Sequence, residues 1–210
     1  WDTAPGTAGV QDGSGTWDTA TANWYDGTNH TWNNSGGDTA ELKNLQGGPR
    51  TYTVALGGPI TIGGLSFTAS SGHYAYTVAA DVSGVLNLGL ASTPISADVQ
   101  GVITAPVGGT GGLTTGGTGT LYLSSANSYA GQTAVSSDLR LRHSSALGTA
   151  AGGTTINAGG TLTFDNTFAG SGDCPDAIVL NGGRLTNNAP TTVTCSGKVT
   201  VQADSRISAL

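Results

Sequence analysis

Short runs of alternating apolar and polar residues recur along the second half of the chain at a nearly constant spacing. Four of these runs align on Ser136, Asn157, Asn181 and Gln202, at intervals of 21, 24 and 21 residues. Strict alternation predicts β-strands with one buried face. A period near 20 residues, with glycine, threonine and asparagine between the strands, is typical of stacked β-coils that cannot bury their apolar faces alone. The pattern therefore predicts a β-solenoid with almost no helix.

Two apolar ladders are predicted from these alignments, each with one member on every coil. The first consists of Leu121, Leu141, Leu162, Leu185 and Ile207, and the second of Val135, Ile156, Leu180 and Val201. Parallel strands of successive coils would pair along the axis of the rod, so only its two ends would keep unpaired strand edges. We predict an all-β fold, a parallel β-helix with about 20–23 residues per coil and about ten coils.

Composition divides the chain into three regions. Residues 1–46 hold all four tryptophans and are predicted to form an N-terminal cap or edge region. Residues 47–107 carry alternating runs between glycine-containing turns and are predicted to form less regular coils. Residues 108–210 carry the regular repeat. We therefore expect one continuous rod with an atypical beginning.

The overall composition disfavours several classes of protein. Glycine accounts for 35 of the 210 residues, yet there is no Gly-X-Y repeat, so neither collagen nor a flexible linker fits. The net charge is −6, whereas a protein that binds nucleic-acid phosphates needs a basic stripe. No apolar run approaches the roughly 20 residues that span a bilayer. The chain starts at Trp1, as a processed polypeptide would, and we expect a mature extracellular protein without a nucleic-acid partner or a transmembrane segment.

The two cysteines, Cys174 and Cys195, are 21 residues apart, which is one repeat period. Equivalent positions on neighbouring coils lie about 4.8 Å apart, a separation that a disulfide accepts. We predict a disulfide that clips two coils together and stabilises the fold by about 3 kcal/mol. The alternative is a pair of reduced thiols that pack as small apolar side chains. Two cysteines without a histidine nearby in sequence make a poor zinc site, so no metal and no cofactor is predicted.

Residues 109–135 resemble the autotransporter-associated β-strand repeat. The motif of that repeat is matched here at Gly109, Gly111, Leu113, Gly117, Gly119, Leu121, Leu123, Asn127, Tyr129, Gly131, Thr133 and Val135. The resemblance implies a right-handed parallel β-helix in a secreted or cell-surface bacterial protein that works as a passenger, an adhesin or a structural stalk. It also implies that the motif residues are structural: Asn127 would pair its amide with the backbone at a corner, and Tyr129 would pack across the turn.

Two charged clusters are candidates for binding. Arg140, Arg142 and His143 could bind an acidic saccharide, although alternation with leucine favours arginines that simply face solvent. Asp173 and Asp176 could hold calcium, but two carboxylates supply only part of the roughly six to eight oxygens that this ion needs, which favours a simple turn. No carboxylate pair for acid and base catalysis can be assigned, so no catalytic residue is predicted.

The aromatic start of the chain has two interpretations. The tryptophan and tyrosine side chains of this region could form a platform on which sugar rings stack. They could instead cap the open end of the solenoid, where uncovered core and strand edges invite aggregation, and we favour the cap. These side chains are Trp1, Trp17, Trp24, Trp32 and Tyr25. At the other end, residues 206–210 are predicted to be a strand without a cap, so either the polypeptide continues or this end pairs with another molecule.

Three functions follow from these features. The leading hypothesis is an extracellular or cell-surface structural rod that self-associates through its ends into filaments or a matrix. The second is an adhesin or carbohydrate-binding passenger module that recognises a surface glycan. The third is a polysaccharide-degrading β-helix enzyme, which we do not favour because no acid and base pair is evident.

Overall fold

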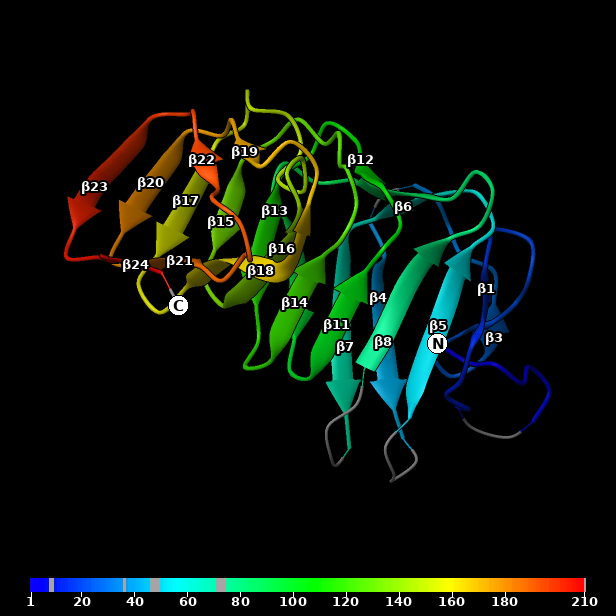
Figure 1. The fold of residues 1–210 in the computed structure, drawn as a ribbon. Helices are drawn as coiled ribbons and strands as arrows, with labels where there is room; N and C mark the ends of the chain where they lie inside the picture. Colours follow the sequence, from blue (N-terminus) through cyan, green and yellow to red (C-terminus); the bar gives the residue numbers. More distant parts are fainter. Residues whose placement is uncertain (8–9, 36, 46–49, 71–74, 210) are drawn as a thin grey trace.

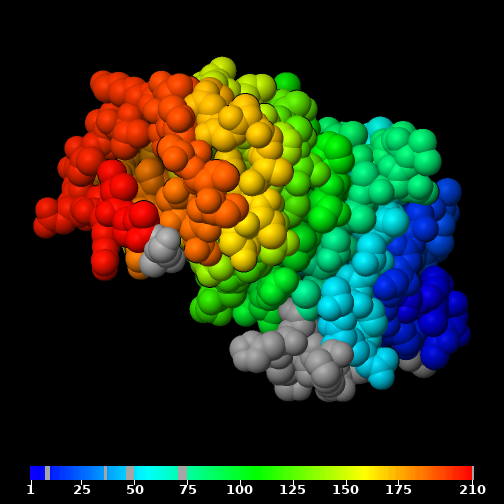
Figure 2. All heavy atoms as spheres, viewed as in Figure 1, coloured from blue at the N-terminus to red at the C-terminus, as the bar shows by residue number. Residues whose placement is uncertain are grey.

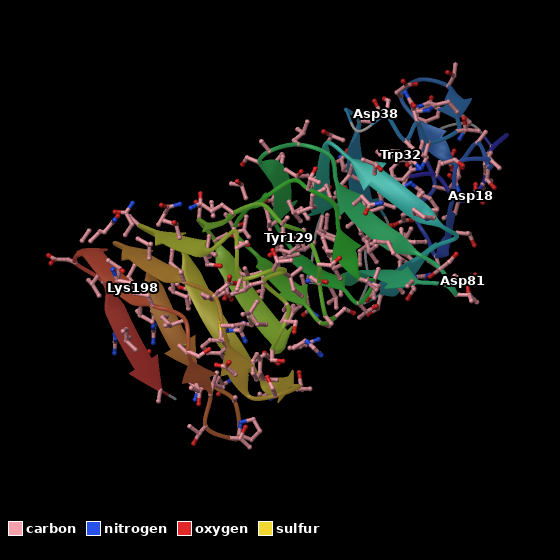
Figure 3. All side chains as sticks on the ribbon, turned by 90° about the horizontal axis from the view of Figure 1, so that it is seen from above. Asp18, Trp32, Asp38, Asp81, Tyr129 and Lys198 are labelled. Carbon is pink, nitrogen blue, oxygen red and sulfur yellow. The ribbon has the colours of Figure 1, made fainter. Side chains whose placement is uncertain are left out.

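The computed structural model describes residues 1–7, 10–35, 37–45, 50–70 and 75–209. Short strands stack side by side along one axis, and the chain follows this axis from its N-terminal to its C-terminal end (Figures 1 and 2). Figure 3 shows Trp32 near one end, Tyr129 midway and Lys198 near the other. The predicted all-β parallel solenoid is therefore confirmed. Within the described residues, no helix is long and apolar enough to cross a membrane.

Two long parallel sheets run along the solenoid. In the described part of the chain, the longer sheet has nine strands, in the order β1 (Gly15–Trp17), β5 (Thr51–Leu56), β8 (Ala75–Ala80), β11 (Gln100–Ile103), β14 (Thr120–Leu123), β16 (Asp138–His143), β18 (Thr161–Ala169), β21 (Arg184–Asn187) and β24 (Arg206–Ala209). The second sheet consists of β4 (Thr39–Asn44), β7 (Gly64–Ala69), β10 (Thr93–Ala97), β13 (Leu113–Gly116), β15 (Thr133–Val135), β17 (Thr154–Asn157), β20 (Ile178–Asn181) and β23 (Val199–Ala203).

Smaller sheets complete the fold. A parallel sheet in the first half consists of β6 (Pro59–Ile62), β9 (Val85–Leu88) and β12 (Val107–Gly108). In the second half β19 (Asp173–Cys174) pairs with β22 (Thr194–Cys195). An antiparallel hairpin of β2 (Trp24–Tyr25) and β3 (Asn29–His30) lies in the N-terminal region.

The coils vary in length more than the sequence pattern indicates. In the longer sheet from β5 onwards, paired residues of successive strands are as few as 18 positions apart, at Leu123 and Leu141, and as many as 26 apart, at His143 and Ala169. The solenoid makes about seven turns, so the prediction of ten was wrong. The number is smaller because the early coils are longer than expected and because much of residues 1–38 builds the structure at the N-terminal end.

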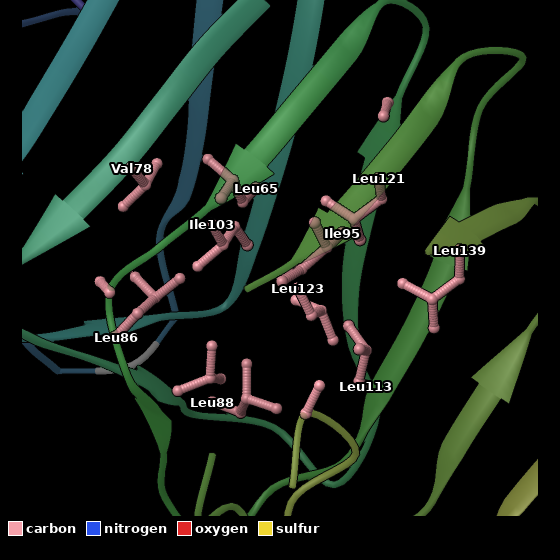
Figure 4. Packing of buried hydrophobic residues seen from close by; sticks show 14 of the residues in the cluster. Leu65, Val78, Leu86, Leu88, Ile95, Ile103, Leu113, Leu121, Leu123 and Leu139 are labelled. Carbon is pink, nitrogen blue, oxygen red and sulfur yellow. The ribbon is translucent and has the colours of Figure 1, made fainter. Parts of the chain in front are cut away.

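The core is a column of aliphatic side chains inside the coils. Strand residues alternate between inner and outer positions, as at Val54 and Leu56 in β5, because successive side chains of a strand point to opposite faces. Figure 4 shows leucines and isoleucines of successive coils meeting in this interior. Each fully buried aliphatic side chain contributes roughly 2 kcal/mol by leaving water. Because one coil supplies only a few of them, stability depends on stacking.

One predicted ladder is confirmed and the other is partly wrong. The confirmed ladder, in register from coil to coil, consists of Val135, Ile156, Leu180 and Val201. The other ladder runs through Leu121, Leu139, Leu162, Leu185 and Ile207. Leu141, which we predicted as its second member, pairs with Leu123 instead. Both leucines of β16 are buried, so alternation alone could not distinguish them, and the coil that contains them is shorter than the average period.

The last of the four alignment points is displaced by one residue. Val201 pairs with Leu180 as expected, but Ala203 rather than Gln202 pairs with Asn181. One extra residue in a strand is a bulge, and a pattern of period two does not reveal it. The earlier alignment points do lie together: Asn181 Nδ2 donates to Asn157 Oδ1 (3.4 Å), and Asn157 Nδ2 donates to the hydroxyl of Ser136 (3.3 Å).

Asn127 of the repeat motif links three coils at a buried corner. Its Oδ1 accepts a hydrogen bond from the backbone nitrogen of Val107 (2.8 Å), and its Nδ2 donates to the carbonyl oxygen of Ala146 (2.6 Å). A backbone group without a partner in this position would cost about 1–3 kcal/mol. The amide therefore does the pairing that the resemblance implies.

Tyr129 and Gly111 of the motif lie where coils approach closely. Tyr129 is buried, and its hydroxyl is 2.7 Å from the hydroxyl of Thr133. A Cβ atom at Gly111 would collide with the carbonyl oxygen of Leu90 on the preceding coil. Only glycine allows that approach.

Cys174 and Cys195 lie directly opposite each other in β19 and β22. Their predicted adjacency is confirmed, whereas both are free thiols in this structure and the disulfide stays a prediction. The hydrogen bond between the two sulfur atoms raises the pKa of Cys174 and lowers the pKa of Cys195 to about 7. The thiolate of Cys195 is therefore the more accessible of the two at neutral pH.

Candidate functional site

The four tryptophans pack into one cluster at the N-terminal end of the solenoid. Ring centroids are 4.7 Å apart for Trp17 and Trp24, 4.9 Å for Trp17 and Trp32, and 5.3 Å for Trp1 and Trp24, with tilted or edge-to-face geometry. Their exposed fractions range from 0 to 6%. Aromatic contacts of this kind contribute about 1 kcal/mol each beyond the burial of their surface. The cluster therefore closes the core at this end.

Hydrogen bonds fix the cluster to the first coils. Trp1 Nε1 donates to the carbonyl oxygen of Gly13 (3.1 Å), and Trp32 Nε1 donates to that of Thr61 (3.0 Å). The backbone nitrogen of Trp1 donates to the carbonyl oxygen of Glu41 in β4 (3.1 Å). Because β4 is the last strand of its sheet, this bond partly covers an edge that would otherwise stay open.

A buried aspartate holds the first loop against the hairpin. Asp2 Oδ1 accepts hydrogen bonds from the backbone nitrogens of Ala4 (3.1 Å) and Gln11 (3.2 Å), and Oδ2 accepts one from Asn29 Nδ2 (2.6 Å). Burial opposes ionisation of Asp2, but the hydrogen bonds together lower its pKa below the ordinary value. The ionised carboxylate therefore ties Ala4 and Gln11 to Asn29 in β3.

A hollow of about 590 Å³ lies beside this cluster, between the hairpin and β4. Its lining residues are Trp1, Val10, Trp24, Tyr25, Asp26, His30, Trp32, Asp38, Thr39, Glu41, Lys43 and Leu45. The volume is in the range of small-molecule sites. Figure 3 places Trp32 and Asp38 together at this end of the rod.

The rim of the hollow carries more negative than positive charge. Asp26, Asp38 and Glu41 are exposed, and Lys43 is the lysine beside them. His30 Nε2 lies 3.5 Å from Asp26 Oδ2. Three carboxylates against one lysine and one histidine make the rim an acceptor of hydrogen bonds and an attractive surface for positive charge.

The tryptophans that line the hollow offer almost no free surface to it. Trp1, Trp24 and Trp32 are only 6, 4 and 4% exposed. Tyr25 is half-buried and is the aromatic side chain here with the most free surface. Trp24 Nε1 is buried without a hydrogen-bond partner among the described residues, so the wall also holds an unused donor. Any stacking on a sugar ring must therefore use Tyr25 first.

The predicted arginine cluster is neutralised by its own neighbours. Arg140 Nε lies 3.2 Å from Asp138, and Arg142 Nε lies 3.3 Å from Asp165. The Arg142 guanidinium also stacks 3.9 Å from the ring centroid of Tyr122. Both guanidinium groups are already paired with carboxylates, so their positive charge is not free to bind an acidic saccharide.

The remaining predicted polar residues have local partners. His143 Nδ1 accepts a hydrogen bond from the backbone nitrogen of Ser145 (3.0 Å). Asp173 accepts hydrogen bonds from the backbone nitrogen and hydroxyl of Ser196, at 3.1 and 2.7 Å. Asp176 is buried: its Oδ2 accepts a hydrogen bond from the hydroxyl of Thr154 (3.4 Å), and its Oδ1 is unpaired among the described residues. In the described ranges, no three His, Cys, Asp or Glu side chains gather closely enough to hold a metal.

The aromatic residues of the hollow were expected from the sequence, whereas the charged residues of its rim were not. Asp26, Asp38, Glu41 and Lys43 come from a turn, a loop and the outer face of β4, which meet only in the folded chain. The alternation over residues 39–44, with every second residue exposed, is a signal that could have shown which side chains face outward.

Fold and hollow together define a rod-like β-solenoid with a ligand-sized cavity at one end. The chain is 34% identical, in an alignment of 193 residues that covers 88% of its length, to the adhesin BmaC autotransporter of Brucella suis biovar 1 (strain 1330). It spans 5% of the length of that protein. No family model and no solved structure matches the chain. The chain is therefore similar to one segment of a much longer autotransporter adhesin.

Proposed function

We propose that this chain is a rigid, surface-displayed segment of an adhesin-type passenger and that its N-terminal hollow takes part in recognition. The observation that carries the proposal is the 34% identity to an autotransporter adhesin over 88% of the chain. The fold supports it, because stacked coils form an extended and stiff body that can hold a site away from a cell. An extracellular or cell-surface location belongs to the same proposal.

A surface glycan is the ligand class that fits the hollow best. Carboxylates of Asp26, Asp38 and Glu41 can accept hydrogen bonds from sugar hydroxyl groups, and Tyr25 offers aromatic surface to a ring. Glu41 Oε1 already accepts a hydrogen bond from Thr68 (2.8 Å), which orients its carboxylate. A few oriented polar groups around an aromatic wall are typical of such sites.

The test is a glycan array probed with the whole chain, followed by affinity measurements on two variants. Tyr25→Ala and Asp38→Asn alter the hollow without touching the buried cluster, and each is expected to weaken binding roughly tenfold. Asp81→Asn, in an exposed turn away from the hollow, is the matched control and should bind normally. Replacing the tryptophans would be uninformative because they are buried.

Two results would contradict this function. If no glycan binds and beads coated with the chain adhere to host cells no better than uncoated beads, the adhesin role is wrong. If a glycan binds but Tyr25→Ala and Asp38→Asn bind it as well as the unaltered chain, recognition does not use the hollow.

End-to-end assembly stays a prediction, and the two ends suggest its form. The N-terminal end is closed by the tryptophan cluster, whereas apolar side chains of the last coil are exposed. For two copies of this segment, a contact between their last coils would close as a dimer, because the tryptophan cluster covers the opposite end of the described coils.

We propose no catalytic activity for this segment. The named relative is an adhesin, and a carboxylate pair aimed at a shared point is what a glycoside hydrolase would require. Release of reducing ends or unsaturated products from acidic polysaccharides by the purified chain would contradict this part of the proposal.

A further inference from the structure

A second, shallower hollow of about 370 Å³ lies at a corner of the last coils, far from the tryptophan cluster. It is bounded by glycine pairs 159–160 and 182–183 and by Arg184, Arg206 and Asp204. These residues belong to the turns that lead into β18, β21 and β24. Three successive coils therefore contribute to one surface.

Two arginines stand directly opposite each other beside this hollow. Arg184 in β21 and Arg206 in β24 are register partners in neighbouring parallel strands. Such strands are about 4.8 Å apart, so two positive charges are held side by side on the same face. Like charges directly opposite each other destabilise a sheet unless something neutralises them.

The contrast with the other arginine pair is informative. Arg140 and Arg142 each have an aspartate within 3.3 Å. Among the ion pairs of the described residues, none involves Arg184, Arg206 or the nearby Asp204. Arg184 instead directs Nε and Nη2 to the hydroxyl of Ser208, at 3.3 and 3.2 Å. Although the chain has a net charge of −6, no acidic side chain of the described residues forms an ion pair with Arg184 or Arg206.

Arg206 is exposed and Arg184 is half-buried beside the glycine corners. A Cβ atom at Gly183 would collide with the side chain of Ile156 on the coil below, so the close stacking requires glycine there. No side chain from the corner can therefore fold over the arginines from that position. The charged pair lies beside an open, side-chain-poor hollow.

We propose that Arg184 and Arg206 bind one compact anionic group, a carboxylate or a sulfate, of an acidic polysaccharide. Guanidinium groups bind such oxyanions through paired hydrogen bonds, and two of them at strand spacing can grip one anion from both sides. This site goes beyond the proposed function, since it lies on the last coils and needs a charged ligand.

The experiment is a calorimetric titration of the full chain with four probes. They are a sulfated oligosaccharide, a uronic-acid oligosaccharide, a neutral oligosaccharide of equal length, and inorganic sulfate. The two acidic oligosaccharides, or one of them, should bind, whereas the neutral one should not bind. If inorganic sulfate binds as tightly as the oligosaccharides, the site takes a free anion and the polysaccharide proposal is overturned.

Variants separate a specific site from general charge attraction. Arg184→Gln and Arg206→Gln should each weaken binding at least tenfold. Arg50→Gln removes the same charge from an exposed position before β5 and should leave binding unchanged. Arg184→Lys keeps the charge but not the paired donors, so it should retain part of the affinity. Measurable binding by this variant also shows that the site still folds.

Two results overturn the proposal. One is an equal loss of binding in Arg50→Gln and Arg206→Gln, which would mean that only net charge matters. The other is the absence of binding by both acidic oligosaccharides to the unaltered chain. Either result leaves the glycan test of the N-terminal hollow unaffected, because that test uses different residues.

Discussion

The two ends of the solenoid meet the same physical problem in different ways. At the N-terminal end Trp17 is 0% exposed, and the other tryptophans seal the core with it. At the C-terminal end, Val201 and Ile207 occupy the positions that are inward in earlier coils, yet they are 60 and 63% exposed. Among the described residues, the tryptophan cluster covers the first coils, whereas no further strand stacks on the last coil.

This difference shows that burial in the solenoid comes from the next coil as much as from the coil itself. Leu180 and Leu185 are nearly fully buried, whereas their register partners Val201 and Ile207 are exposed. The sequence pattern is the same in both coils. The two coils differ in whether a further described coil stacks on them.

The largest expected effect comes from breaking the closed end. Trp17→Ala leaves a large cavity among four packed rings and should lower the free energy of unfolding by about 3–5 kcal/mol. Ile207→Ala, at the open end, removes a side chain that is already largely in water and should cost less than about 1 kcal/mol. Urea unfolding of both variants measures the two values. Equal losses would mean that the ends do not differ as the structure indicates.

Oxidation of the thiol pair should stabilise the coils near the open end. A disulfide between Cys174 and Cys195 closes a loop of 21 positions and should raise the free energy of unfolding by about 3 kcal/mol. The chain is compared after exposure to oxidised glutathione and after reduction. Cys195→Ser should show no difference between the two treatments. A wild-type chain that forms no intramolecular bridge under oxidation would show that the thiols are held apart.

A buried carboxylic acid should make stability depend on pH. Burial raises the pKa of Asp176 from its ordinary value of 3.8 to about 6. The folded state holds the proton of Asp176 more tightly than the unfolded state does. The contribution of this proton to the free energy of unfolding is therefore fully favourable below pH 3.8, and it declines as the pH rises towards 6. The loss is on the order of 3 kcal/mol.

Asp176→Asn tests this dependence directly. Unfolding curves at pH 4 and pH 7 should show that the variant gains stability over the unaltered chain only at the higher pH. Asp81→Asn, at an exposed turn, should follow the wild type at both values. If Asp176→Asn keeps the wild-type profile, the buried carboxyl is not the source.

The smallest expected effect on stability comes from charging the open end. Val201→Lys and Ile207→Lys should change the free energy of unfolding by less than about 0.5 kcal/mol, since both positions are exposed. Sedimentation should show that the unaltered chain dimerises at high concentration and that these variants do not. Val82→Lys, at a fully exposed turn, is the control. Assemblies that keep growing with concentration would contradict the closed N-terminal end.

Much of the fold could be predicted from the sequence because period and alternation are local properties. The ladder through Val135, Ile156 and Leu180 and the adjacency of Cys174 and Cys195 follow from counting residues. Turn length is what the count could not supply. For that reason the choice between Leu139 and Leu141, the bulge near Gln202 and the number of coils were predicted wrongly.

The candidate site was only half predictable. Aromatic residues stand out in a chain with four tryptophans, so their grouping was expected. The acidic rim joins Asp26 to Glu41 across a loop whose path no local pattern specifies. The Arg184 and Arg206 pair could have been found from the repeat alone, because the two residues are 22 positions apart, close to one period.

Native-state hydrogen exchange on the full chain tests the central claim most directly, because it measures the opening free energy along the rod. Amides of β23 and β24 should exchange first, since no other strand of the described chain pairs with their outer edges. Those of β14, β16 and the strands beneath the tryptophan cluster should exchange last and together. Exchange of β1 and β4 before β23 and β24 would contradict the account of one closed and one open end.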